Sequence, residues 1–397
     1  MAFRWVFAEP EQDVSVRTLQ ESLKVPFSIA KLLTLREIET FDAARFFFRP
    51  GLELLHDPFR MKDMEKAADR LSKAIRSGEK ILVYGDYDVD GTTATACMLL
   101  FLREFGVEAE FFIPHRFKDG YGINSDGIQR AAEIGADLVI SVDCGITAIE
   151  EAKLARDLGI DLVICDHHTV GKELPDAVAV LDPKRPDCDY PFDGLSGAGV
   201  AFKLIQATVD RLGLAAEMAT RYLDLVAIST ASDIVPVVDE NRVLMRWGLE
   251  QLNRSPRPGL KALLEVVKQE GATITGTTIV FTIGPRINAA GRMGDAGLAV
   301  ELLISKEPER AQSLAGELET INRKRRSTDS RTMKEAVAKL EKEYDLEALS
   351  SMVLHNPDWH LGVIGIVASR LVDAYYRPAI MLSSVDGKIK GSARSIR

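Results

Sequence analysis

Acidic and histidine side chains recur in this sequence at the points where runs of apolar residues end. The clearest cluster is Asp166-His167-His168, which follows the apolar run at 161–165. Runs at 81–85 and 138–142 also end in acids, and one more acid closes a mainly helical stretch. The acids of these other clusters are Asp86, Asp88, Asp90, Asp143 and Asp233. Carboxylates and imidazoles gathered in one place repel each other or need desolvation, so the pattern predicts a site for a divalent cation.

The elements that would hold these clusters alternate between strands and helices. Short apolar runs of this kind are typical of buried parallel strands. Strands are predicted at 81–84, 108–113, 138–142 and 161–165, and the intervening helices at 92–105, 125–135 and 147–158. This alternation predicts an α/β fold, a parallel sheet with helices on both faces. Because ligands of such sheets collect at the carboxyl ends of the strands, we expect the clusters to meet there.

The segment Asp86-Tyr87-Asp88-Val89-Asp90-Gly91 carries acids at alternate positions, which point the same way in an extended chain. Hard oxygen ligands favour Mg²⁺ or Mn²⁺, and the nearby histidines favour Mn²⁺. The alternative is a calcium-binding loop or an acidic turn, although no glutamate stands near Ala96, where a calcium loop would close. Asp143 and Asp233 each have a simpler alternative as acids that cap or end a helix. For Asp166-His167-His168 the alternative is a solvated turn.

Length and composition limit the class of protein. The chain has 397 residues, of which 46% are hydrophobic and 27% charged, so we expect more than one soluble domain. No apolar run reaches the ~18 residues of a membrane span. Residues 1–10 lack the apolar core of a signal peptide, and we expect a cytoplasmic protein. The net charge of −9 argues only weakly against nucleic-acid binding, because basic residues can line a separate groove.

The pattern divides the chain into four parts. Residues 1–60 form an N-terminal extension, and residues 61–305 carry the α/β pattern. Residues 306–345 predict a long, highly charged connecting helix, and residues 346–397 predict a smaller α/β domain. Because a domain of about 50 residues is only marginally stable, we expect the smaller domain to be incomplete and the chain to be shortened at its C-terminus.

Together, the clusters resemble the signature of the DHH phosphoesterase superfamily, whose name describes a motif like Asp166-His167-His168. The resemblance extends to RecJ-type single-strand-specific exonucleases and covers roughly residues 50–397. It is carried by the segments Gly85–Gly91, Pro114–Gly122, Ile283–Arg292, Trp359–Gly365 with Arg370, and Gly391–Ser395. The resemblance implies a parallel-sheet DHH catalytic domain that a long helix joins to a smaller α/β domain of the DHHA1 type.

By this resemblance the protein would be a 5′→3′ exonuclease that hydrolyses single-stranded DNA by two-metal-ion catalysis, with Mn²⁺ or Mg²⁺. It would release mononucleotides in DNA repair and recombination, as a monomer, with a single-strand-binding protein and a helicase as partners. The alternative within the superfamily is an oligonucleotide or cyclic-dinucleotide phosphodiesterase, which would need a closed pocket. A third alternative, a non-catalytic scaffold, conflicts with the presence of every acid and both histidines.

The resemblance also implies roles for individual residues. The metal ligands would be Asp88, Asp90, Asp143, His167 and Asp233, with Asp143 bridging the two ions. Asp86 would lie at or beside the ions, and His168 would face the scissile phosphate as an electrophilic or acid catalyst, so we expect both to be catalytic. The residues expected to bind substrate are Arg116, Tyr121, Arg286, Asn288, His360, Arg370, Gly391, Ser392 and Arg394. For each arginine the alternative is a surface ion pair, and Arg286 is the strongest candidate.

One position departs from the pattern of the superfamily. Many members have a histidine where this chain has Tyr84, and tyrosine is a poor metal ligand at neutral pH. We therefore expect the ion near Asp88 to be bound more weakly, or Asp86 to take part in binding it.

Overall fold

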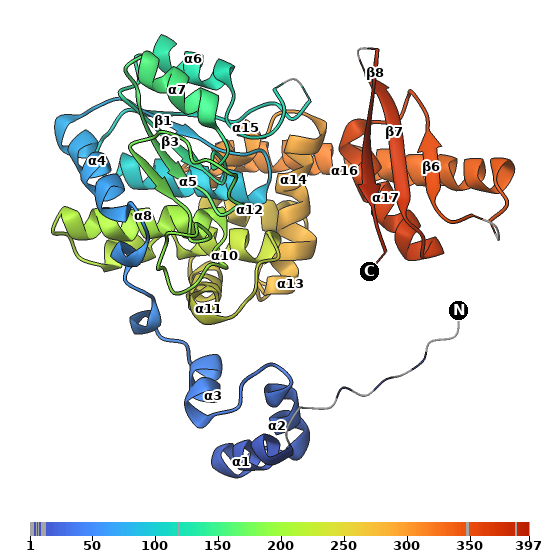
Figure 1. The fold of residues 1–397 in the computed structure, drawn as a ribbon, viewed down its shortest axis with the longest axis horizontal. Helices are drawn as coiled ribbons and strands as arrows, with labels where there is room; N and C mark the ends of the chain where they lie inside the picture. The colour runs from blue at the N-terminus through green and yellow to red at the C-terminus, as the bar shows by residue number, and fades with distance from the viewer. Residues whose placement is uncertain are drawn as a thin grey trace.

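A five-stranded parallel sheet forms the centre of the larger domain (Figure 1). The computed structural model describes residues 4, 6, 8, 13–117, 119–346, 349–385 and 387–396. The strands lie in the order β2-β1-β3-β4-β5, and their bounds are β1 Ile81–Tyr84, β2 Ala109–Phe112, β3 Leu138–Val142, β4 Asp161–Cys165 and β5 Ala179–Leu181. Ile81 pairs with Leu138, which pairs in turn with Asp161. The carboxyl ends of β1, β3 and β4 therefore lie side by side at one edge of the sheet.

Alternate side chains of the strands face two separate apolar cores. In β1, Ile81 and Val83 belong to a core shared with α4, α5 and α8, whereas Leu82 and Tyr84 belong to a core shared with α6 and α7. The two sets of helices cover opposite faces of the sheet (Figure 1). Their bounds are α4 Met64–Ser77, α5 Val89–Arg103, α6 Ser125–Glu133, α7 Ile149–Asp157 and α8 Gly197–Arg211. Strands β1 and β3 are buried throughout, as expected for a sheet covered on both faces.

Further helices extend the larger domain beyond α5 and α8. Helix α10 packs against α5, α8 and α11, which brings its C-terminal end toward the edge of the sheet. A π-helical turn, η3, leads directly into α14. The bounds are α9 Glu217–Thr220, α10 Leu223–Ser232, α11 Asp239–Arg254, α12 Pro258–Val266, α13 Gly276–Thr278, η3 Ile279–Ile283, α14 Gly284–Met293 and α15 Gly297–Ile304.

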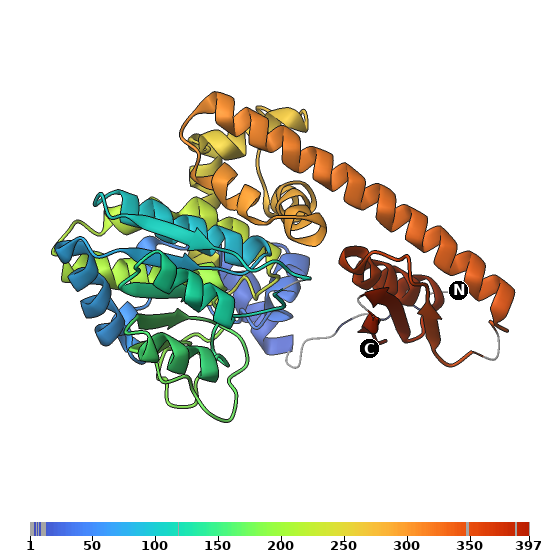
Figure 2. The same ribbon diagram turned by 90° about the horizontal axis from the view of Figure 1, so that it is seen from above.

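One long helix connects the larger domain to a smaller one. Helix α16, Pro308–Glu343, packs on α12, α14 and α15 at its start and on α17 and β6 farther along (Figure 2). The smaller domain is a sheet in the order β6-β7-β8, with β6 and β7 parallel and β8 antiparallel. Its elements are β6 Met352–His355, α17 Leu361–Tyr375, β7 Ala379–Val385 and β8 Lys388–Arg394.

The N-terminal part forms a small helical unit with its own core. Helices α1 Asp13–Leu23, α2 Phe27–Thr34 and α3 Phe41–Phe48 bury apolar side chains such as Leu19 and Leu33 against one another. The short 3₁₀ turns η1 Leu52–Leu54 and η2 Pro58–Arg60 then lead to α4. This unit lies apart from the five-stranded sheet (Figure 1).

The two domains meet where α14 ends and α17 begins. A Cβ atom placed on Gly362 would lie 2.0 Å from the carbonyl oxygen of Arg292, so only glycine lets the two backbones come this close. The rings of Phe117 and His360 also meet edge to face, with centroids 5.5 Å apart. The smaller domain is thus held beside α14.

The predicted α/β fold with a parallel sheet is confirmed, but the sequence pattern missed two strands. Strand β5 has only three residues, too few to show a period. Strand β8, whose sequence is Lys-Ile-Lys-Gly-Ser-Ala-Arg, is exposed along most of its length and lacks a regular alternation of apolar residues. None of the helices in the described parts of the chain is long and apolar enough to cross a membrane.

A buried ion pair anchors the start of α11, the helix that follows Asp233. Lys203 Nζ lies 2.6 Å from Glu240 Oε2, and both side chains are completely buried. The same ammonium donates a hydrogen bond to the backbone oxygen of His56, 2.9 Å away, and the hydroxyl of Tyr190 donates to Glu240. The network therefore ties the segment before α4 to α8 and α11.

We expect Lys203→Met to lower the free energy of unfolding by about 3–5 kcal/mol, because it leaves the Glu240 carboxylate buried without its partner. The matched control is Lys261→Met, which removes an exposed lysine 4.0 Å from Glu265 and should change stability by no more than about 0.5 kcal/mol. Urea denaturation of the two variants measures the difference. Equal losses of stability would contradict the importance of the buried pair.

Candidate active site

The acid and histidine clusters meet at the carboxyl edge of the sheet. The strand order reverses at β1, which has β2 on one side and β3 on the other, and ligands of open α/β sheets bind at such a point. Asp86, Asp88 and Asp90 come from the junction of β1 with α5, and Asp143 and His167 follow β3 and β4 directly. Asp233 joins them from the C-terminal end of α10.

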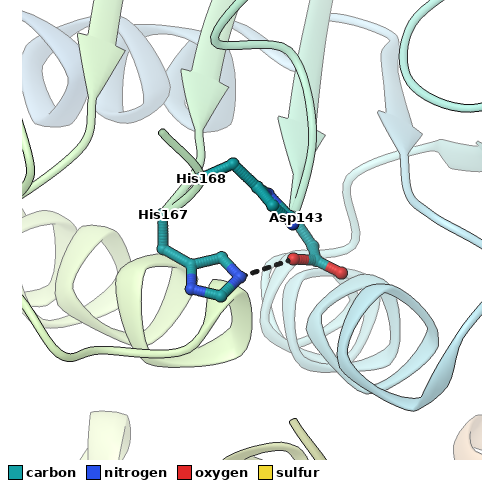
Figure 3. A group of neighbouring side chains, drawn as sticks. All are labelled: Asp143, His167 and His168. Carbon is teal, nitrogen blue, oxygen red and sulfur yellow. Dashed lines mark hydrogen bonds and ion pairs between the residues drawn. The ribbon is translucent and has the colours of Figure 1, made fainter. Parts of the chain in front are cut away.

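Ligand atoms of these residues lie close enough to hold two cations. Those of Asp90, His167 and Asp233 lie within 4.8 Å of one another, and so do those of Asp86, Asp88 and Asp143. A third such group contains Asp143, His167 and His168. The ring of His167 turns toward Asp143, with Nε2 3.1 Å from Oδ1 (Figure 3), and lies 3.6 Å from Asp90 Oδ2. Asp143 therefore lies between the two groups, where a bridging ligand would be needed.

The backbone around the cluster takes conformations that ordinary packing does not explain. Asp143 has a φ of 63°, in the left-handed region that non-glycine residues rarely adopt. A Cβ atom on Gly91 would lie 2.5 Å from the backbone nitrogen of Asp86, so the turn from β1 into α5 requires glycine there. Asp88 caps α5 by accepting a hydrogen bond from Gly91 N.

The carboxylates raise one another's pKa values. Burial, followed by Asp90, Asp88 and Asp86, holds the pKa of Asp143 well above its usual range. Burial and Asp88 raise the pKa of Asp86 to about 8. Burial and Asp90 raise the pKa of Asp233 to about 7. In the absence of a cation, the cluster therefore holds protons that ordinary surface carboxylates would have lost.

One buried oxygen of the cluster, Oδ1 of Asp86, has no hydrogen-bond partner among the described residues, which suits a cation site. Nε2 is the ring nitrogen of His167 that faces Asp143 and Asp90, so it is the atom that would bind a cation. Burial lowers the pKa of His167, so this imidazole is neutral, the form that binds metal ions. Hard carboxylate oxygens together with one neutral imidazole are a donor set suited to Mn²⁺ or Mg²⁺. The residues present therefore fit a pair of divalent cations.

His168 is held by Asp166 and faces outward. Its Nδ1 lies 2.7 Å from Asp166 Oδ1, and this hydrogen bond raises the pKa of His168. Asp166 also accepts hydrogen bonds from the backbone nitrogens of Ile146 and His167. Burial opposes the ionisation of Asp166, but the hydrogen bond and charge of His168, together with the backbone hydrogen bonds, outweigh burial and lower the pKa of Asp166. Nε2 of His168 is left to meet the hydroxyl of Tyr121, 3.0 Å away.

Tyr84 takes no part in the cluster. Its hydroxyl donates a hydrogen bond to Gly122 O, 3.0 Å away, and accepts one from Asn124 N. Asn124 caps α6, so the tyrosine supports the loop that precedes that helix. Burial raises the pKa of Tyr84, and the phenol stays neutral. The carboxylate of Asp86 lies near that of Asp88, and its part in binding an ion stays a prediction.

A cleft of about 340 Å³ opens beside His168, between the two domains. Among the described residues, its lining contains four cationic side chains and no carboxylate. Five of the residues expected to bind substrate line it, namely Arg116, Tyr121, Gly391, Ser392 and Arg394. Arg116 lies over the ring of Tyr87, 4.9 Å from its centroid, and Tyr87 stands between Asp86 and Asp88 in the chain. The cleft and the acid cluster are therefore contiguous.

The other four residues expected to bind substrate lie outside the lining of the cleft. Arg286 Nε lies 2.8 Å from Glu319 Oε2, and this half-buried pair ties α14 to α16. Arg370 forms an ion pair with Asp329. Nδ1 of His360 accepts a hydrogen bond from Gly362 N and caps α17, and Asn288 is half-buried on α14. A role of these four residues in substrate binding stays a prediction.

The sequence pattern did not single out Arg292, although it lies in the same motif as Arg286. Arg292 lines the cleft and pairs with no carboxylate among the described residues. Burial, then Arg116 and Arg325, lowers its pKa to about 10. Lys390, Tyr87 and Phe117 also line the cleft. A half-buried arginine that lacks a carboxylate partner is suited to binding an anion.

Asp182 was also missed by the sequence analysis. It follows β5 directly and is fully buried, and its Oδ2 has no hydrogen-bond partner. Burial raises its pKa to about 7. Like the acids of the other clusters, Asp182 stands directly after a strand. That strand, β5, has only three residues and was not predicted, so the position of Asp182 could not be recognised from the sequence.

Comparison with known proteins agrees with this site. A model of the N-terminal domain of the DHH family matches residues 80–230. That range includes every acid and histidine of the cluster except Asp233. The fold and the site together therefore define a DHH-family protein.

Relatives that match more of the chain identify a narrower family within the DHH proteins. The single-stranded-DNA-specific exonuclease RecJ of Bacillus subtilis (strain 168) is 44% identical over 396 residues, which are 99% of this chain and 49% of the relative. RecJ of Escherichia coli (strain K12) is 37% identical over 85% of this chain and 61% of its own length. The chain thus spans about half to three fifths of the length of these curated relatives.

Solved structures give the same result. A crystal structure of exonuclease RecJ bound to manganese superposes with a TM-score of 0.76 at 37% identity, over 87% of this chain and 84% of that one. RecJ of Thermus thermophilus in complex with Mn²⁺ gives a TM-score of 0.83 at 33% identity, over 98% of this chain and 55% of that one. The chain belongs to the RecJ family of exonucleases, and the resemblance seen in its sequence is confirmed.

We expect the affinity of the cluster for Mn²⁺ to rise with pH. The raised pKa values mean that Asp86 and Asp233 both hold protons below about pH 7, and a cation must displace these protons to bind. In calorimetric titrations the affinity should increase through about pH 7–8. Asp86→Asn should remove the upper part of this rise, whereas the exposed Asp157→Asn should leave it unchanged. A constant affinity across this range would contradict the coupling.

Proposed function

We propose that the chain is a metal-dependent 5′→3′ exonuclease that hydrolyses single-stranded DNA and releases mononucleotides. One observation carries the proposal, namely a cluster of metal-ligating side chains that opens directly onto a cationic cleft between two domains. The relatives support it, because they are named single-stranded-DNA-specific exonucleases. They do not favour the alternative, an oligonucleotide or cyclic-dinucleotide phosphodiesterase.

Two divalent ions, Mn²⁺ or Mg²⁺, would occupy the cluster. Asp90, His167 and Asp233 would hold one ion, and Asp86 and Asp88 would hold the other, with Asp143 shared between them. When bound, the ions would supply an activated water and neutralise the charge that develops on the phosphate. Solved RecJ structures contain Mn²⁺ or Mg²⁺, which supports this choice of metals.

The chain's own residues would orient the substrate at these ions. Asp166 holds His168 by its Nδ1, so Nε2 would donate a hydrogen bond to an oxygen of the scissile phosphate in place of Tyr121. Arg116, Arg292 and the backbone around Ser392 would bind a phosphate of the strand in the cleft. A terminal 5′-phosphate bound there would place the first bond of the strand at the cluster, as action from the 5′ end requires.

The wider role is also a proposal. An exonuclease of this specificity would act in DNA repair and recombination, with a single-strand-binding protein and a helicase as partners that deliver unwound strands. We propose that the chain works as a monomer in the cytoplasm.

Digestion of labelled strands tests the activity. With Mn²⁺ present, a 5′-labelled single strand should yield labelled mononucleotide from the start, whereas a 3′-labelled strand should first yield a ladder of shortened products. A blunt duplex and a dinucleotide should be cut far more slowly. Early release of mononucleotide from the 3′ label would contradict the polarity, and preference for the dinucleotide would favour the alternative phosphodiesterase.

Asp143→Ala should abolish Mn²⁺-dependent hydrolysis, because it removes the carboxylate shared by the two groups. The fold should persist, since the carboxylate lies at the edge of the sheet and contributes little to the core. The matched control is Asp157→Ala, an exposed acid on α7, which should keep wild-type activity. Near-full activity of Asp143→Ala would contradict the two-ion model.

Arg292→Gln should weaken the binding of single-stranded DNA without weakening the binding of Mn²⁺. If the arginine contacts one phosphate, the slope of log affinity against log salt should fall by about 1. Arg246→Gln, an exposed arginine on α11 that pairs with Glu250, serves as the control and should leave the slope unchanged. Equal losses of affinity for DNA and for Mn²⁺ would show that Arg292 is structural.

A further inference from the structure

The carboxylate of Asp90 is held by the first turn of a different helix. The backbone nitrogen of Gly197 donates to Oδ2 at 2.7 Å, and that of Ala198 donates to Oδ1 at 2.8 Å. Both nitrogens belong to the start of α8, where backbone N–H groups have no partner within the helix. Asp90 itself lies on α5 and is buried. The backbone at the start of α8 therefore fixes the orientation of the Asp90 side chain, which is one of the proposed metal ligands.

A serine on a third helix completes this arrangement. The hydroxyl of Ser229, on α10, lies 2.7 Å from Asp90 Oδ1 and 2.6 Å from the hydroxyl of Ser196. The hydroxyl of Ser229 has a single proton, which it donates to Oδ1 of Asp90. Ser196 must then donate its own proton to Ser229, while its oxygen accepts from Gly199 N and caps α8. Both serines are completely buried.

This chain of hydrogen bonds leaves Asp90 one free position. A carboxylate offers about four lone-pair sites, and the backbone of α8 and Ser229 occupy three of them. The remaining site is on Oδ2, the oxygen that lies 3.6 Å from Nε2 of His167. The free lone pair of Oδ2 is therefore on the side of Asp90 that faces His167, another proposed ligand.

The same turn of α8 also limits the position of Asp143. A Cβ atom on Gly197 would lie 2.6 Å from the Cβ of Asp143 and 2.7 Å from its Oδ1. Gly197 thus contributes a hydrogen bond to Asp90 and makes room for Asp143 at once. The start of α8 therefore contacts one residue from each of the two sets of proposed ligands, namely Asp90 from the first and Asp143 from the second.

We propose that Ser229 is a positioning residue for the metal centre, which acts through Asp90 and is coupled by Ser196 to the cap of α8. It touches neither substrate nor ions, and its hydroxyl fixes the carboxylate so that the free lone pair of Oδ2 faces the cation. This inference rests on the proposed use of two divalent ions. Residues that orient metal ligands in this way commonly change metal affinity about 10- to 100-fold when they are removed.

The test compares Mn²⁺ binding by three variants of the whole chain. Titrations followed by electron paramagnetic resonance, which detects free Mn²⁺, should show an affinity about 10- to 100-fold weaker for Ser229→Ala. Ser229→Thr keeps the hydroxyl and should bind Mn²⁺ more tightly than Ser229→Ala. Thr230→Val is the matched control, because it removes a buried hydroxyl on the same helix that bonds only to Val226 O. It should bind Mn²⁺ like the wild type.

Thermal unfolding in the presence of a chelator separates positioning from stability. We expect Ser229→Ala and Thr230→Val to lose similar stability, with only the first losing affinity for Mn²⁺. Wild-type affinity in Ser229→Ala, or equal losses of affinity in Ser229→Ala and Thr230→Val, would overturn the proposed role of Ser229 but not the proposed function. Failure of the wild-type chain to bind Mn²⁺ would overturn the proposed function as well. If Ser229→Ala does not fold, the affinity of Ser229→Thr decides, and a value below that of Thr230→Val would count against the proposal.

Discussion

Mutual repulsion among buried carboxylates is the constraint on which the rest of this site depends. The pKa of Asp143 is held well above its usual range by burial and by four neighbouring acids. No single element brings these acids together: β1, β3, β4 and α10 each contribute at least one side chain. The fold therefore stabilises an arrangement that the side chains alone would avoid, and a pair of cations would relieve the repulsion.

The acids near strand ends were predictable because their signal is local. A run of apolar residues fixes the strand, and the parallel arrangement then brings its carboxyl end to the common edge. Asp143 and His167 follow this rule, and the parallel sheet that carries them was also predictable. Asp233 is different, because it ends a helix and reaches the cluster only through the packing of α10 on α5 and α8. Its local sequence left its role open, and only the tertiary structure brings it close to Asp90 and His167.

The positions of the residues around the cleft could not be predicted from local sequence patterns. Arg286 and Arg292 belong to one motif, and nothing in the motif says which of them faces the cleft. The answer depends on Glu319, which lies on the next long helix and pairs with Arg286. Tyr84 is a similar case, because its partner Gly122 lies in a loop of no regular pattern. Contacts between residues far apart in the chain produce no periodic pattern in the sequence, so they cannot be predicted from it.

The close approach of α14 and α17 has a consequence for the width of the cleft. A Cβ atom on Gly362 would lie 2.0 Å from the carbonyl oxygen of Arg292, so any larger residue at position 362 would push α17 away from α14. The cleft takes its lining from both domains, with Arg292 on one side and Ile364 and Gly365 on the other. A single missing side chain therefore sets how far apart the two walls of the cleft stand.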